Sequence, residues 1–152
     1  MSTVIEANTI TVQQTTEACQ NLLRGEISAV ETYNLAIEKY GDQPFADTLR
    51  QIRANHLENE RLLREHVGWL GSEPATGSGA WGVLVKTLQT GANFFGENAS
   101  LSVLKTGEEH GAKDYQDALE GELMREAREM IDRVLLPRVQ SNLATLESIK
   151  EA

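Results

Sequence analysis

The sequence predicts an all-α protein, a four-helix bundle made of two helical hairpins. Apolar residues recur at helical spacing along most of the chain, and the alternating pattern of half-buried strands is nearly absent. A run rich in glycine, serine and proline, residues 71–79, divides the chain into halves of similar length. Each half carries one copy of the string Gly-Glu-x6-Tyr-x2-Ala, starting at Gly25 and at Gly107. The repeat therefore predicts two related hairpins.

Start and stop signals set the bounds of the predicted helices. Thr11-x-x-Gln14 has the form of a capping box, and Gly71 follows the apolar stripe of the second helix. Pro137 is expected to kink the last helix, because proline lacks the N–H group that a helix interior requires. The chain is expected to be one domain, 1–152, with hairpins over 11–70 and 80–151, and with helices at 11–40, 45–70, 99–119 and 122–150 and a short apolar helix at 80–95.

The connection between the second and third core helices, residues 71–98, is long enough to cross the length of a bundle. Such a crossover is the ferritin-like arrangement rather than the simple up-down-up-down one. The apolar segment 81–95 within it exceeds what a crossover needs. We expect this segment either to form a subunit interface or to pack on the end of its own bundle.

Composition excludes several classes of function. The chain has 14 basic and 23 acidic residues, a net charge of −9, which argues against nucleic acid or an anionic membrane as the main partner. No apolar run is long enough to span a membrane or serve as a signal peptide, so a soluble, cytoplasmic protein is expected. Cys19 is the only cysteine and is expected to be a small buried side chain, which leaves no thiolate metal cluster.

The repeat places one glutamate within the apolar stripe of each of two helices. Glu26 shares a helical face with Leu22, Leu23, Ala29, Val30, Tyr33 and Ile37, and Glu108 does so with Leu101, Leu104, Ala112, Tyr115 and Leu119. A carboxylate inside a core costs several kcal/mol unless it is paired or protonated. Two carboxylates at matching positions therefore predict a shared buried partner.

Ferritin-like carboxylate proteins offer one such partner, a metal pair held by two lone glutamates and two Glu-x-x-His motifs. This sequence has the two glutamates and His56. Arg53 stands where the second helix would carry a ligand glutamate, and Val139 and Asn142 stand in the Glu and His places of the fourth helix. The sequence therefore predicts a degenerate metal site.

Two interpretations remain open at this point. In the first, Glu26 and Glu108 pair with Arg53, Arg138, Asn142 and His56 in a buried network. Tyr33 and Tyr115 also belong to it, as core aromatics whose hydroxyls bond to polar groups in the opposite helix. In the second, a metal site uses Glu26, His56, Glu108 and Glu60, and holds iron or manganese. The first needs no cofactor, and neither predicts a catalytic residue. His66 and His110 are expected to be structural or exposed.

With these motifs assembled, the chain resembles a bacterial family of ferritin-like four-helix bundles described only as a domain of unknown function. The resemblance covers about residues 11–150 and rests on Gly25-Glu26 with Tyr33, on Leu70-Gly-Ser-Glu-Pro with Ser78-Gly-Ala-Trp-Gly82, and on the stretch from Gly107 to Tyr115. It implies a ferritin-like fold and a homo-oligomer, and it implies no activity. The expected role is structural or stress-related and non-catalytic, the alternatives being redox or storage chemistry at a metal or an acidic adaptor for a partner helix.

Overall fold

The computed structural model describes the backbone of residues 2–77 and 92–149, and the side chains of residues 8–77 and 101–149. Every regular element in these ranges is helical. The elements are α1 (Ser2–Tyr40), α2 (Ala46–Trp69), α4 (Ala92–Glu120), α5 (Arg125–Met130), the π-helical turn η1 (Ile131–Leu135) and α6 (Leu136–Ser148). The prediction of an all-α protein is confirmed for the described part of the chain.

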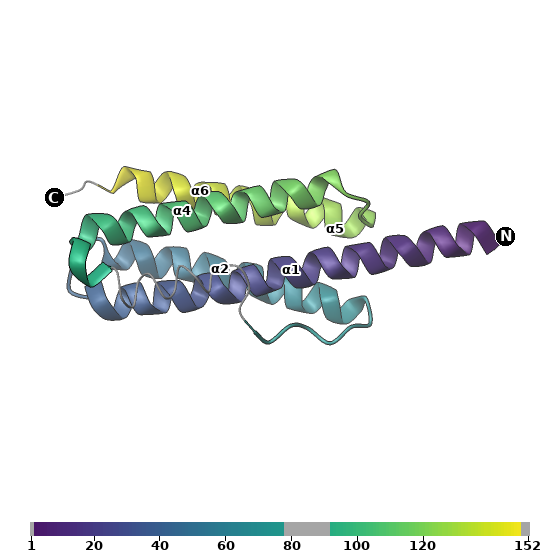
Figure 1. Cartoon of the computed structure of the whole chain (residues 1–152), viewed down its shortest axis with the longest axis horizontal. Helices are drawn as coiled ribbons and strands as arrows, with labels where there is room; N and C mark the ends of the chain where they lie inside the picture. The colour runs from purple at the N-terminus through teal and green to yellow at the C-terminus, as the bar shows by residue number, and fades with distance from the viewer. Residues whose placement is uncertain (1, 78–91, 150–152) are drawn as a thin grey trace.

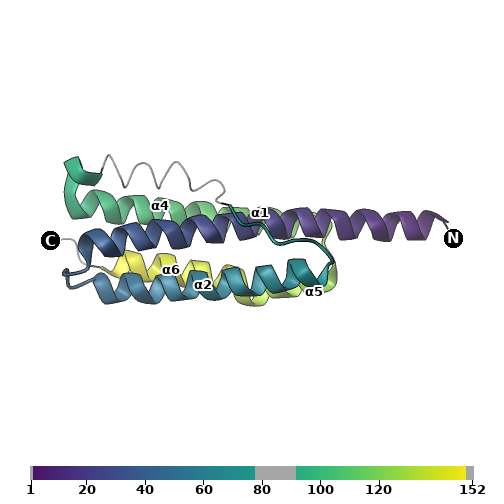
Figure 2. The same cartoon turned by 90° about the horizontal axis from the view of Figure 1, so that it is seen from below.

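The helices lie side by side as two hairpins. Helix α1 packs most extensively against α2, and α4 packs against α6. Helices α2 and α4 run in the same direction, and α4 begins at the end of the bundle opposite to the end of α2 (Figure 1, Figure 2). The end of α2 and the start of α4 therefore lie at opposite ends of the bundle. The predicted helix at 80–95 lies for the most part outside the described residues.

Helix α1 begins nine residues before the predicted start, so the capping box at Thr11 is not used. Ser2 already belongs to the helix, and the first turns of α1 extend beyond the other helices (Figure 2). The Thr15 hydroxyl donates to the carbonyl of Thr11 at 2.7 Å, which is how a threonine is satisfied inside a helix. Helix α4 likewise begins at Ala92 rather than at 99 and continues through Gly96, because a single glycine costs a helix only about 1 kcal/mol.

The bounds of α2 are close to the predicted 45–70, and a glycine ends the helix as expected. Gly71 has φ +88°, the left-handed conformation that glycine adopts without strain. Its N–H donates to the Gly68 carbonyl at 3.0 Å, and the Ser72 N–H donates to the Val67 carbonyl at 3.2 Å. These two bonds form a Schellman motif, which satisfies carbonyl groups at the end of α2.

The irregularity expected at Pro137 takes the form of the π turn η1 directly before it. The Leu136 N–H donates to the Ile131 carbonyl, a bond five residues back rather than four. Pro137 stands in the first turn of α6, where its missing N–H is not needed. The extra residue in the turn accommodates the proline ring, which would otherwise meet the preceding turn of an unbroken helix.

The core contains two apolar clusters with a polar layer between them. One cluster includes Leu23, Leu63 and Ile131, and the other includes Leu49 and Leu104. Five buried polar residues make up this layer, and on α2, α4 and α6 they fall between the residues of the two clusters in sequence order. These residues are Glu26 on α1, His56 and Asn59 on α2, Glu108 on α4 and Asn142 on α6. None of the described helices is long and apolar enough to cross a membrane.

Candidate functional site

His56 is the centre of the polar layer and bonds to both glutamates of the repeat. Its Nδ1 lies 2.6 Å from Glu26 Oε2, and its Nε2 lies 2.6 Å from Glu108 Oε1. The exposed fractions are 1 % for His56, 3 % for Glu26 and 0 % for Glu108, so all three side chains are buried. Both ring nitrogens have carboxylate acceptors, an arrangement that only the doubly protonated imidazolium can satisfy.

The two tyrosines of the repeat bond crosswise. Tyr33 of α1 donates its hydroxyl to Glu108 Oε1 of α4 at 2.6 Å. Tyr115 of α4 donates to Glu26 Oε1 of α1, also at 2.6 Å. Each hairpin therefore supplies the tyrosine that satisfies the glutamate of the other hairpin. This reciprocity follows from the repeat, because Gly-Glu-x6-Tyr places each tyrosine two helical turns after its own glutamate and on the same face.

Two asparagines and one arginine surround the central groups. Asn59 donates to Glu26 Oε1 at 3.3 Å and to the Leu135 carbonyl of the π turn at 3.4 Å. Arg138 Nη1 in turn donates to Asn59 Oδ1 at 2.8 Å. Arg138 therefore acts on Glu26 only through Asn59 and forms no direct ion pair with it.

Asn142 lies against the other side of His56. Its Nδ2 is 3.4 Å from His56 Nε2, and its Oδ1 accepts from Asn55 at 2.8 Å. An amide N–H and an imidazolium N–H are both donors, so the Asn142 contact is not a hydrogen bond in this orientation. Reversing both asparagine amides would turn Asn142 into an acceptor while keeping its bond to Asn55.

The glutamates determine the charge state of His56. Burial lowers the pKa of His56, but the charges of Glu108 and Glu26 and their hydrogen bonds outweigh it and raise the pKa from 6.5 to about 10. Burial also raises the pKa of Tyr33 and of Tyr115 well above 10, with a further contribution from the neighbouring glutamates. At neutral pH the histidine is therefore a cation, and both tyrosines are neutral donors.

One oxygen of the layer has no hydrogen-bond partner. Glu108 Oε1 accepts from both Tyr33 and His56, whereas Glu108 Oε2 is buried and accepts from nothing in the described residues. A buried carboxylate oxygen left in this state costs about 1–3 kcal/mol. Glu26, by contrast, has acceptor bonds on both oxygens.

Two residues predicted to belong to the site lie elsewhere. Arg53 is half-buried at the surface and donates to Asn34 at 3.0 Å, so its expected place beside the glutamates is wrong. Its position three residues before His56 turns it toward α1 at the edge of the bundle rather than inward. Glu60 forms an ion pair with Arg64 at 2.8 Å. The preceding residue, Asn59, lies in the polar layer instead. Glu60 is rotated from Asn59 by about 100° around the helix axis and therefore lies off the buried face.

The remaining histidines and the cysteine take no part in the layer. His66 is half-buried and stacks on Trp69 with ring centroids 5.4 Å apart, and His110 lies 3.6 Å from Asp114 on the surface of α4. Cys19 is buried, and burial raises the pKa of its thiol to about 11. Its thiol is therefore unreactive at neutral pH. Within residues 8–77 and 101–149, no group of three or more carboxylate, imidazole or thiol side chains is arranged to hold a metal ion.

Fold and site together define a helical bundle whose two hairpins are joined by a buried glutamate–histidine–tyrosine network. The chain belongs to the family described as a domain of unknown function (DUF2383), whose model matches residues 14–121. This range includes both copies of the repeat, His56 and both tyrosines. Among curated proteins nothing matches the chain. Among solved structures nothing matches it either.

Proposed function

We propose that the chain is a ferritin-like bundle in which the imidazolium of His56 takes the place of a metal ion, and that its function is structural and non-catalytic. The observation that supports this proposal is the engagement of both ring nitrogens of His56, each 2.6 Å from a carboxylate oxygen. The cation offsets one of the two negative charges of Glu26 and Glu108, a role that a metal ion has in a carboxylate site.

In this proposal the network fixes how the two hairpins meet. His56 belongs to the first hairpin and bonds to Glu108 of the second, and both tyrosine bonds also cross between hairpins. A register shift of one hairpin would leave these buried charges unpaired, at a cost of about 3–5 kcal/mol. The network therefore favours one packing arrangement over others that would bury similar apolar area.

The charge state of His56 also makes it a poor catalytic group. A general base or acid works best with a pKa near the operating pH, and the pKa of His56 is about 10. Its ring nitrogens have no free lone pair at neutral pH.

We further propose a stress-related role in the bacterial cytoplasm, carried out by a homo-oligomer of this chain. Light scattering of the full chain measures the oligomeric state directly.

A second candidate function, iron or manganese binding with redox or storage activity, has one specific observation in its favour. Glu26, His56 and Glu108 meet at one level of the core, and Glu108 Oε2 is an unused anionic oxygen. As they stand, these three side chains are not arranged to hold an ion, so they would have to move to bind one, which would then supply redox chemistry. His56 would first have to lose a proton and release a carboxylate. With a pKa of about 10, that proton costs about 4 kcal/mol at pH 7, at 1.36 kcal/mol per pH unit.

Metal loading and the protonation of His56 distinguish the two candidates. Protein purified without chelator is offered Fe(II) and Mn(II) without oxygen and weighed by native mass spectrometry, and the histidine ring nitrogens are observed by NMR at pH 7–8. The structural proposal predicts less than stoichiometric metal and two protonated nitrogens on His56. Stoichiometric metal that is lost in Glu26→Gln but kept in the matched control Glu60→Gln would overturn it and favour the metal site.

A further inference from the structure

The buried network is not sealed on the side where α1 faces α4. A cavity of about 10 Å³ lies against it. Residues of the network and two glycines are among those that line this cavity, namely Glu26, His56, Tyr115, Gly25 and Gly111. This volume is close to the smallest that holds one water molecule, and a buried water needs two to four polar partners. The lining supplies such partners.

Glu26 has an acceptor position to spare on this side. A carboxylate offers about four acceptor positions. Tyr115 and Asn59 bond to Oε1 of Glu26, and His56 bonds to Oε2. Oε2 therefore keeps room for one further donor, and the cavity lies beside the same side chain.

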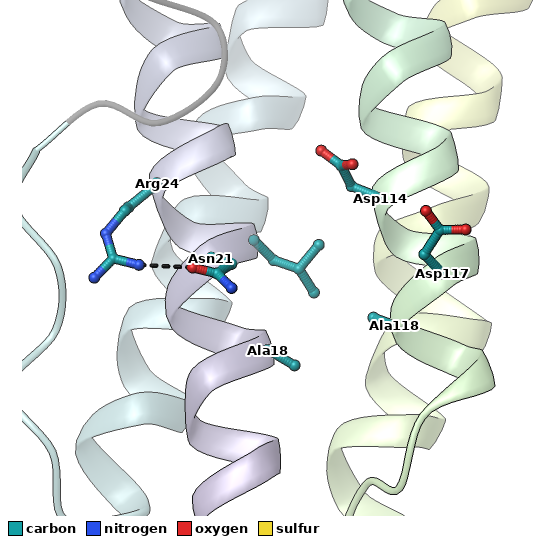
Figure 3. Close-up of a pocket in the computed structure, with 7 residues that line it drawn as sticks. Ala18, Asn21, Arg24, Asp114, Asp117 and Ala118 are labelled. Carbon is teal, nitrogen blue, oxygen red and sulfur yellow. Dashed lines mark hydrogen bonds between the residues drawn. The ribbon is translucent and has the colours of Figure 1, made fainter.

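A surface groove leads to this cavity. The groove has a volume of about 450 Å³ and lies between α1 and α4, and Leu22 and Asp114 line both the groove and the cavity. Figure 3 shows Asp114 extending from α4 toward α1, with Asp117 lying along α4, whereas Arg24 lies on the far side of α1 and donates to Asn21. Asp114 is half-buried, so its carboxyl can meet solvent on one side and the cavity on the other.

The glycine on α1 keeps the connection open. A Cβ atom built on Gly25 would meet no heavy atom within 4 Å, so the space beside this position is empty. Glycine inside a helix costs about 1 kcal/mol relative to alanine, and no turn or positive φ at Gly25 requires it. A larger side chain at this position would fill the space next to Glu26.

We propose that one water molecule binds in this cavity on Glu26 and, with Asp114, forms a proton route between the surface groove and the His56 network of the folded protein. The proposal rests on the proposed function, because it assumes the protonated histidine. Asp114 is a relay in this route. The other charged groups near it are His110, Lys113 and Asp117 on α4, whereas Arg24 of α1 lines the groove but lies on the far side of that helix.

Hydrogen exchange at the His56 ring tests the route in the full-length protein. The exchange rate of the His56 N–H groups with solvent is measured by NMR in wild type, in Gly25→Val and in Asp114→Asn. Asp117→Asn is the matched control, because Asp117 lines the groove but not the cavity. In wild type, we expect the His56 N–H groups to exchange far faster than core amides that exchange only by global unfolding. This rate should be about tenfold or more slower in Gly25→Val and in Asp114→Asn, and unchanged in the control.

Three exchange results would overturn the proposal. They are His56 exchange at the global-unfolding rate in wild type, an unchanged rate in Gly25→Val, and equal effects of Asp114→Asn and Asp117→Asn. A high-resolution crystal structure is a readout that does not depend on the charge of His56. It should show a water within hydrogen-bond distance of Glu26 that is lost in Gly25→Val. A dry cavity would refute the route even if His56 is protonated, and a single-protonated His56 beside a bound water would refute only the proposed function.

Discussion

The stability of the protein should fall as the pH rises from 7 to 9, because the folded state holds a proton on His56 that the unfolded state has lost. The pKa of this group is 6.5 in the unfolded chain and about 10 in the fold. A raised pKa contributes stability that is complete below the unfolded value and is lost as the pH rises through the folded value. The relevant window is therefore about 6.5 to 10.

The magnitude follows from one proton per molecule. Each pKa unit is worth 1.36 kcal/mol, so the slope is about 1.4 kcal/mol per pH unit and the loss between pH 7 and 9 is about 3 kcal/mol. Two other groups limit the usable range. Burial raises the pKa of Cys19 from 9.0 to about 11, so its contribution begins above pH 9. Burial lowers the pKa of His66, so its contribution lies below 6.5.

Urea unfolding followed by circular dichroism at half-unit pH steps measures this slope. His56→Gln should remove it and also lower the stability at pH 7, whereas the exposed-site control His110→Gln should keep it. A flat free energy of unfolding between pH 7 and 9 would refute the reasoning. So would a slope that survives in His56→Gln, because another group would then carry the proton.

Three further predictions concern single side chains. Tyr33→Phe and Tyr115→Phe should each destabilise the fold by about 2 kcal/mol, the usual value of a hydrogen bond to a charged group, and a double-mutant cycle should show coupling through His56. Losses of stability under about half that value would contradict the crossed bonds. Arg138→Ala should lower the stability by about 1–2 kcal/mol, because Asn59 Oδ1 loses the group that donates to it, whereas Arg53→Ala should lower it by less than about 1 kcal/mol. If thermal unfolding shows Arg53→Ala to be the less stable variant, Arg53 belongs to the core. Cys19 should resist alkylation at pH 8 until the protein unfolds, and fast labelling of the native state would show that its burial is wrong.

Local pattern was sufficient for much of the fold and for the centre of the site. The period of the apolar residues predicted the helices, and Gly71 predicted the end of α2 within one residue. The repeat predicted that Glu26 and Glu108 lie in apolar stripes, and both are buried. Burial of a side chain on an amphipathic helix depends on its angle around the helix axis, and this angle follows from its position in the sequence because each residue turns the helix by a fixed amount.

Other features depended on contacts between helices that no local pattern contains. Arg53 and Asn59 are both three residues from His56, on opposite sides of it, and only the packing of α2 against α1 and α6 decides that Asn59 faces Glu26 while Arg53 faces Asn34. The early start of α1 at Ser2 likewise overrides a capping box that is favourable by itself. The sequence alone thus determined the helices and the presence of two buried carboxylates. Only the tertiary structure decided that a histidine cation lies between them, because the charge of His56 depends on three helices that meet at one level of the core.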